Sequence, residues 1–208
     1  MAKLYFRYGA MNSGKSTALL QAAYNYEERG QRVLLAKPQI DTKGASSIVS
    51  RLGVRRTVDF LLGPEDEARR TFHAYAHGQP PGSLLPAEGL PPVACLLIDE
   101  AQFLTPSQVD DLLRIAIIDG VPVLAYGIRT DFQTRAFPGA RRLLELAHSL
   151  EELKTICRCG RKAMFNGRKV GETFVFAGDQ VAIDGVAVTY ESLCAACYLH
   201  ESGGQLTP

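Results

Sequence analysis

The stretch GAMNSGKST, residues 9–17, lies one strand's length into the chain and decides how the rest is read. It satisfies the pattern G-x-x-x-x-G-K-[ST], in which glycines allow backbone N–H groups to turn inward around phosphates. The pattern requires a strand before it and a helix after it. LYFRY (4–8) is typical of a strand, and residues 16–29 carry apolar side chains at helical spacing before Gly30. The stretch therefore predicts a phosphate-binding loop, or P-loop.

The segments that follow predict a parallel sheet. VLLA (33–36) is typical of a buried strand, and a strand, a helix and a strand in this order form a βαβ unit. Further strands are expected at 93–100 and 121–127, and helices at 65–77, 105–118 and 140–148. The predicted fold class is α/β: a P-loop (RecA-like) parallel sheet flanked by helices, with a small β-rich domain at the C-terminal end.

The size and charge of the chain limit its function. The 208 residues allow one domain with an appendage, and not two full ATPase lobes. The 23 basic and 22 acidic residues give a net charge of +1, so we expect neither a nucleic-acid nor a membrane partner. No apolar run has the length of a signal peptide or a membrane span, and we expect a cytoplasmic protein.

At about residue 151 the sequence changes to short strand-like segments with glycines and cysteine pairs. We expect a nucleotide-binding domain at 1–150, a small domain of short strands at 151–200 and a tail at 201–208. Residues 78–92 hold five prolines and three glycines, which predicts an exposed loop without regular structure.

Residues of the P-loop and of the strand at 93–100 predict a site for ATP and Mg²⁺. Lys15 neutralises the β- and γ-phosphates, and the Ser16 hydroxyl is a magnesium ligand. Asp99, at the carboxyl end of an apolar strand, is the second expected magnesium ligand, and Glu100 is a candidate general base. The residues expected at the phosphates are Gly9, Ala10, Met11, Asn12, Ser13, Gly14, Lys15, Ser16, Asp99, Glu100, Ala101 and Gln102. Helicases and other ATPases also carry a D-E pair, so the motif leaves open whether Glu100 deprotonates water or an alcohol.

Four of the five cysteines form two close pairs, C-R-C and C-A-A-C. Four thiolates suit a tetrahedral Zn²⁺ ion, which would be structural because no coordination position remains for a substrate. Zinc would stabilise the segment 160–193, which is too short to build its own core. The expected ligands are Cys157, Cys159, Cys194 and Cys197.

The ordered motifs resemble a known family across nearly the whole chain. YFRYGAMNSGKSTALL, IDEAQF, YGIRTDFQTRAFPG, LKTICRCGRKAMF and TYESLCAACY resemble the thymidine kinases of the cellular (type II) family, the bacterial members most closely. The resemblance implies an enzyme that transfers the γ-phosphate of ATP to the 5′-hydroxyl of thymidine to give dTMP, with Glu100 as the base. It also implies a homotetramer and feedback inhibition by dTTP.

The resemblance further implies a nucleoside pocket. In the family, a loop between the cysteine pairs closes over the nucleoside and holds thymine through backbone groups. The residues this assigns to the nucleoside are Met11, Phe132, Val181, Ala182, Ile183, Asp184, Gly185 and Tyr190. Asp41 and Lys43 match a family segment near the phosphates that usually reads D-x-R, and Asp184 stands where the family usually has the first of two glycines.

Two other classes of function share parts of the pattern. A nucleic-acid-stimulated ATPase with a zinc-binding module would use the P-loop, the D-E-A-Q motif and the paired cysteines. The near-zero net charge and the room for only one ATPase lobe argue against it. A non-enzymatic zinc-binding scaffold would leave Lys15 and Glu100 without a role.

Overall fold

In the computed structural model, residues 1–39, 46–82, 89–180 and 188–206 are described. A six-stranded sheet in the order β5-β2-β6-β7-β1-β8 forms the centre, and every neighbouring pair in it is parallel. Its strands are β1 (Leu4–Tyr8), β2 (Arg32–Pro38), β5 (Phe60–Leu62), β6 (Val93–Ile98), β7 (Val123–Gly127) and β8 (Ser149–Glu152). The α/β class with a parallel sheet is thereby confirmed.

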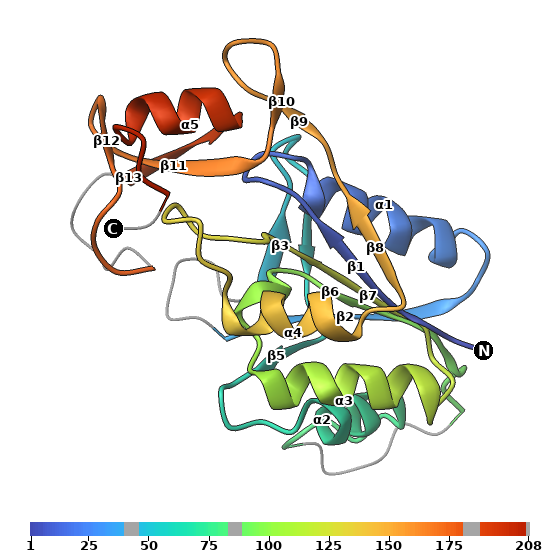
Figure 1. The fold of residues 1–208 in the computed structure, drawn as a ribbon. Coiled ribbons are helices and arrows are strands. Elements are labelled where there is room, and N and C mark those ends of the chain that lie inside the picture. The colour runs from blue at the N-terminus through green and yellow to red at the C-terminus, as the bar shows by residue number, and fades with distance from the viewer. Residues whose placement is uncertain (40–45, 83–88, 181–187, 207–208) are drawn as a thin grey trace.

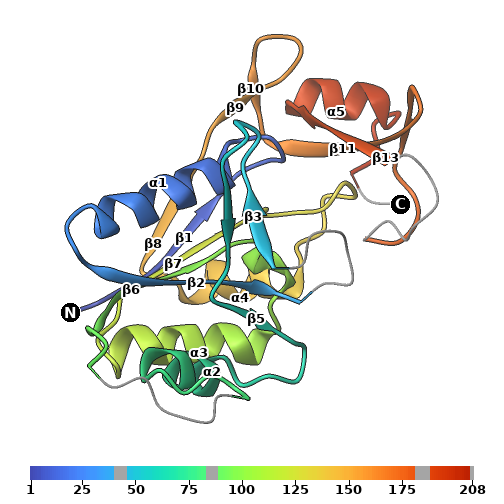
Figure 2. The same ribbon diagram turned by 180° about the vertical axis from the view of Figure 1, so that it is seen from behind.

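Helices cover both faces of the sheet (Figures 1 and 2). Helix α1 (Lys15–Glu27) packs on one face, and α2 (Ala68–Ala76), α3 (Pro106–Ile117) and α4 (Pro138–Leu146) pack on the other. A hydrophobic core lies on each face of the sheet, and alternate residues of β2 belong to one or the other. Val33 and Leu35 belong to the core on the α1 side, and Leu34 belongs to the core on the opposite side. A strand buried on both faces must be apolar throughout, which explains runs such as VLLA and VACLLI.

Local signals set the helix boundaries. Helix α3 begins with Thr105 as its N-cap and Pro106 in its first turn, as the sequence predicts, and Gln108 completes a reciprocal capping box with Thr105. Helix α4 begins at Pro138, two residues before the predicted start, because proline is suited to the first helical position. It ends at Leu146 because the chain turns into β8, which pairs with β1 from Tyr5↔Ser149 onward. The main sheet therefore extends past residue 150.

The C-terminal part, β9 to α5, contains a two-stranded sheet and a three-stranded sheet beside a small core. Strand β11 (Phe165–Val170) lies between β12 (Thr173–Val175) and β13 (Val188–Leu193), and β9 (Thr155–Ile156) pairs with β10 (Lys162–Ala163). The sequence did not predict helix α5 (Ala195–Glu201), which begins directly after a cysteine whose sulfur accepts from the Cys197 N–H. The core of this part contains Tyr198, Leu193 and Ala163 beside the cysteines.

Two further features bear on the predictions. Residues 78–82 and 89–92 of the proline-rich stretch form no helix or strand, and residues 83–88 lie outside the described ones. None of the helices in the described ranges combines the length and the apolar character needed to cross a bilayer.

Candidate active site

The phosphate loop, residues 9–16, connects the end of β1 to the start of α1 (Figure 1). A Cβ on Gly9 would lie 2.4 Å from Ser13 Oγ and 2.5 Å from the Leu153 carbonyl oxygen, so only glycine fits there. Gly14 has φ +78°, a left-handed conformation that glycine adopts without strain. The Lys15 ammonium group donates to the Ala10 carbonyl at 2.8 Å and to Ser13 Oγ at 3.3 Å. The loop therefore curls around the lysine that the motif assigns to the phosphates.

Asp99 follows the last residue of β6 and lies next to the phosphate loop. Its carboxylate accepts a hydrogen bond from the Ser16 hydroxyl at 3.3 Å. Only 6% of Asp99 is exposed, and burial together with the neighbouring Glu100 carboxylate raises its pKa to about 6. The Ser16 hydroxyl and the buried Asp99 carboxylate are adjacent oxygen ligands, and a cation would stabilise the carboxylate charge. Such a pair fits Mg²⁺.

Glu100 has a strained backbone and a fixed side chain. Its φ of +52° is unusual for a residue with a Cβ. The Gln102 side-chain amide donates to Glu100 Oε2 at 2.6 Å, and Gln102 Oε1 accepts from the Ile128 N–H at 3.1 Å. A Cβ on Gly127 would lie 2.6 Å from Gln102 Oε1, so glycine leaves the room that this amide occupies. Gln102 thus orients the Glu100 carboxylate.

A cavity of about 760 Å³ lies above the phosphate loop. Lys15, Ser16 and Glu100 line it, together with Met11 and Ile128. Burial lowers the pKa of Lys15, and the Glu100 and Asp99 carboxylates act in the opposite direction. The cavity brings together a lysine, a hydroxyl group and a carboxylate, which are the groups that phosphoryl transfer uses to hold phosphates, to bind Mg²⁺ and to accept a proton.

Phe132 and Tyr190 come together around a buried arginine. The Arg168 guanidinium lies 3.6 Å from the centroid of the Phe132 ring and 5.8 Å from that of the Tyr190 ring, and its Nε donates to the Tyr190 hydroxyl at 3.3 Å. The same guanidinium donates to the carbonyl oxygens of Asp179 and Gln180, at 2.7 and 3.0 Å. Sequence reasoning missed Arg168, because a single arginine in a strand gives no signal of its contacts.

Two polar residues of the C-terminal part hold the phosphate loop at Met11. Asn166 Oδ1 accepts from the Met11 N–H at 2.7 Å, and the Ser192 hydroxyl donates to the Met11 carbonyl oxygen. Both side chains are buried, and Asn166 also donates to the Thr130 carbonyl at 2.8 Å. The sequence did not identify these residues either. They connect the cysteine-containing part to the phosphate loop.

The four paired cysteines form one cluster in which all sulfur atoms lie within 4.8 Å of one another. Tetrahedral zinc with Zn–S bonds of about 2.3 Å places its sulfurs about 3.8 Å apart, so the cluster fits a Zn²⁺ ion. The backbone N–H of Cys197 lowers the pKa of the Cys194 thiol to about 7, whereas hydrogen bonds with the other three thiols raise the pKa of Cys197 to about 12. A bound cation would favour the thiolate at both. Cys95 lies apart from the cluster, buried in β6.

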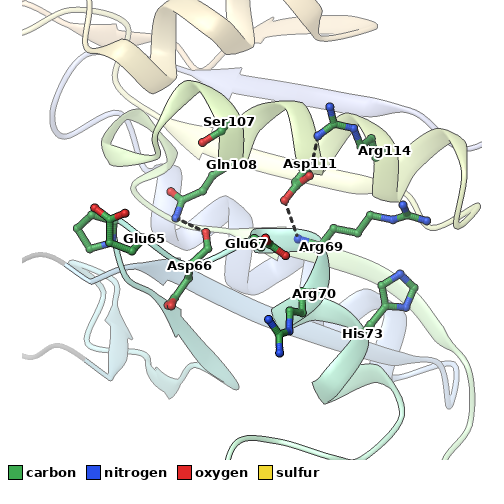
Figure 3. A pocket seen from close by; sticks show the side chains of 11 residues that line it. Glu65, Asp66, Glu67, Arg69, Arg70, His73, Ser107, Gln108, Asp111 and Arg114 are labelled. Carbon is green, nitrogen blue, oxygen red and sulfur yellow. Dashed lines mark hydrogen bonds and ion pairs between the residues drawn. The ribbon is translucent and has the colours of Figure 1, made fainter.

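A second cavity of about 700 Å³ lies between α2 and α3 (Figure 3). Three of its charged side chains form ion pairs: Arg114 with Asp111 at 2.8 Å, and Arg69 with Asp119 at 2.7 Å. None of the predicted site residues that the structure describes lines this cavity. We therefore place the candidate site at the phosphate loop.

The remaining predicted residues divide into two groups. Ala101 and Gln102 lie buried beneath Glu100 and not among the residues that line the cavity. The others lie outside the described residues: Asp41, Lys43, Val181, Ala182, Ile183, Asp184 and Gly185.

Comparison with known proteins adds to this geometry. The family model described as thymidine kinase matches residues 2–71 and 84–198, so that its gap falls partly in the proline-rich stretch. The chain is 43% identical to a thymidine kinase of Chromobacterium violaceum, with 97% of this chain and 100% of the relative covered. It is 45% identical to one of Legionella pneumophila strain Paris, over 99% of this chain and 91% of the relative. With the thymidine kinase of Enterobacteria phage T4 the identity is 42%, over 93% and 94%. A match over almost the whole length, on a P-loop site with its partner carboxylates in place, shows that the chain belongs to the thymidine kinase family.

Proposed function

We propose that the protein transfers the γ-phosphate of ATP to the 5′-hydroxyl of thymidine, giving dTMP and ADP, with Glu100 as general base. The observation that carries the proposal is the cavity that Glu100 shares with Lys15 and Ser16. Membership of the thymidine kinase family supports the choice of thymidine, and it favours an alcohol over water as the group that attacks.

Each residue of the site has a distinct role in the proposed phosphoryl transfer. Lys15 neutralises the phosphate oxygens, and Ser16 and Asp99 would hold Mg²⁺, which would supply further positive charge to the phosphates. As the 5′-oxygen forms its bond to the γ-phosphorus, the bond from that phosphorus to the bridging oxygen of ADP breaks, and the hydroxyl proton passes to Glu100. Gln102 donates to one carboxylate oxygen and leaves the other to receive this proton.

The nucleoside would lie beside Phe132 and Tyr190, near Met11 of the phosphate loop. Arg168 holds the first two in place, and Tyr198 of α5 donates to the Phe132 carbonyl oxygen at 2.7 Å. We further propose that residues 181–185 cover the base through backbone groups and that Asp41 and Lys43 lie near the phosphates. A site covered in this way would exclude water and prevent hydrolysis of ATP.

On the basis of the family and of the cysteine cluster, we also propose five properties beyond the reaction itself. They are a P-loop domain with a separate zinc-binding domain, a structural Zn²⁺ on the four clustered cysteines, a homotetramer, a cytoplasmic location and inhibition by dTTP. Competition of dTTP against both ATP and thymidine would test the last of these.

The decisive experiment compares the wild-type protein with Glu100→Gln. Phosphorylation is measured with ATP and thymidine, deoxyuridine, deoxycytidine, deoxyadenosine and the corresponding ribonucleosides. We expect thymidine to be phosphorylated, and we expect the variant to lose about 10²- to 10⁴-fold in kcat with ATP binding intact, because the amide keeps the size and loses the basicity.

Glu172→Gln is the matched control, because the Glu172 side chain is 98% exposed and pairs only with Lys169. It should keep full activity. Hydrolysis of ATP without any nucleoside product would mean that water is the attacking group, and the kinase proposal would then be wrong.

A further inference from the structure

A β-hairpin that the sequence analysis did not assign to the site reaches the phosphate loop (Figure 2). It consists of β3 (Ser47–Val49) and β4 (Arg55–Thr57), paired antiparallel. Its turn is tight: the Ser50 N–H donates to the Val54 carbonyl at 2.8 Å, and the Gly53 N–H donates to the Ser50 carbonyl at 3.0 Å. Gly53, with φ +86°, supplies the left-handed conformation that this turn needs.

The hairpin is fixed to the body of the protein at its base. Ile48 and Val58 belong to the hydrophobic core beneath α1. On β4, the Arg56 guanidinium forms two hydrogen bonds with the carboxylate of Glu27, the last residue of α1, at 2.6 and 2.7 Å. Such a bidentate pair has a defined geometry. The turn at residues 50–54 therefore has a fixed position relative to the phosphate loop and α1.

Arg51, in this turn, lines the same cavity as Lys15, Ser16 and Glu100. Lys15 and Arg51 are the cationic side chains in the described lining of the cavity. Two cations that line one cavity repel each other, and a polyphosphate anion bound between them would remove that cost.

We infer that Arg51 is a catalytic residue that contacts the triphosphate of the donor together with Lys15. The inference rests on the proposed function and adds to it a residue outside the P-loop motif. The guanidinium would bind phosphate oxygens through two parallel N–H groups and stabilise the negative charge on the phosphoryl group during transfer. The arginine comes from the same chain, which makes it an arginine finger in cis.

The test compares Arg51→Gln and Arg51→Lys with Arg55→Gln. Arg55 is an exposed arginine of the same hairpin and does not line the cavity, so Arg55→Gln controls for a change in net charge and in hairpin stability. We expect Arg51→Gln to lower kcat/KM for ATP by about 10²-fold or more, since a cis arginine supplies about 10³-fold or more in related P-loop enzymes. Arg51→Lys should recover part of the loss, because the charge remains and the planar fork does not.

Three further measurements distinguish a contact with the triphosphate from a general loss of structure. The KM for thymidine and the melting temperature should stay at the wild-type values in both Arg51 variants, and the Kd for Mg-ATP from calorimetry should rise. An Arg51→Gln protein whose kcat/KM for ATP equals that of Arg55→Gln would overturn the inference, as would a loss confined to KM for thymidine. If the wild type binds ATP without phosphorylating thymidine, the proposed function fails. The Kd for Mg-ATP then still decides whether Arg51 contacts the triphosphate.

Discussion

At the scale of single residues, the site depends on two carboxylates that follow the same strand. Asp99 and Glu100 are neighbours in the chain, and the left-handed backbone at Glu100 turns the chain after β6. Asp99 hydrogen bonds with Ser16, and Glu100 hydrogen bonds with Gln102 and lines the cavity. Their environments thus differ, so that the buried Asp99 suits the proposed metal ligand and Glu100 suits the proposed base, a division that environment commonly imposes on paired acids.

The buried Asp99 predicts a specific dependence of stability on pH. Its pKa is raised to about 6 in the folded protein, from 3.8 in the unfolded chain, so the folded state binds this proton more tightly. The corresponding contribution to stability is present below about pH 4 and is lost as the pH rises through about 6. Asp99→Asn removes the titration and keeps the size. We expect the variant to be more stable than the wild type above pH 6, by about 3 kcal/mol.

The measurement is the melting temperature of both proteins from pH 4 to pH 8, in magnesium-free buffer without chelator so that zinc is retained. The difference between the proteins should disappear toward pH 4. Asp179→Asn, at an exposed position, should follow the wild-type curve throughout. A stability difference of constant size across the pH range would show that Asp99 is not the titrating group.

At the scale of elements, the pairing of β11 with β13 organises the nucleoside side of the site. The register places Asn166 opposite Ser192 and Arg168 opposite Tyr190. Residues two apart on a strand share a face, so these two cross-strand pairs point the same way. The first pair holds Met11 of the phosphate loop, and the second packs against Phe132. One strand pair therefore contacts both the phosphate loop and the proposed nucleoside pocket.

This arrangement predicts that Arg168→Met weakens thymidine binding and leaves ATP binding unchanged. Only 6% of Arg168 is exposed, and a desolvated cation over an aromatic ring stabilises its geometry by about 2 kcal/mol. Loss of the guanidinium frees the Phe132 ring, the Tyr190 hydroxyl and the carbonyls of Asp179 and Gln180 together. We expect KM for thymidine to rise at least tenfold, which corresponds to about 1.4 kcal/mol.

The control is Lys169→Met, one residue along β11. Lys169 lies over Phe174 at 5.3 Å and pairs with Glu172, away from Phe132. Steady-state kinetics with each substrate varied in turn should give wild-type constants for this variant. Equal effects on KM for ATP and KM for thymidine in Arg168→Met would contradict a role at the nucleoside.

At the scale of the whole molecule, the cysteine cluster lies outside the cavity and yet is connected to it. Cys194 follows β13 directly, two residues after Ser192, which holds the phosphate loop. Its small core, with Leu193 and Tyr198, is too limited to be stable alone. Metal binding to such a part supplies folding free energy. We therefore expect that zinc bound to the cluster would help the phosphate loop to keep its contacts at Met11.

We accordingly predict one zinc per chain and joint loss of zinc and activity in Cys194→Ser. Metal content is measured by atomic absorption, and activity with ATP and thymidine. Cys95→Ala is the control, because Cys95 is a buried core residue of β6 and its thiol lies outside the cluster. It should retain zinc, with at most a moderate loss of stability for the small cavity it leaves. A zinc-free Cys194→Ser protein with wild-type kinetics would show that the cluster has no part in holding the site.

The sequence by itself determined the parallel α/β sheet, the phosphate loop, the Asp99–Glu100 pair and the four cysteines. Each of these depends on local pattern: apolar runs, glycine and lysine at fixed spacing, or residue types that bind few other partners. Only the tertiary structure showed the contacts of Gln102, Arg168, Asn166 and Ser192 and brought Arg51 to the cavity. Most of these contacts join residues that are distant in sequence, as with Met11 and Ser192. Polar side chains of this kind occur in every protein, and what they do depends on which groups the fold places within hydrogen-bonding distance. The strand β8 and the helix α5 escaped prediction for a related reason, because pairing with β1 and capping by Cys194 outweigh the weak local preferences of their sequences.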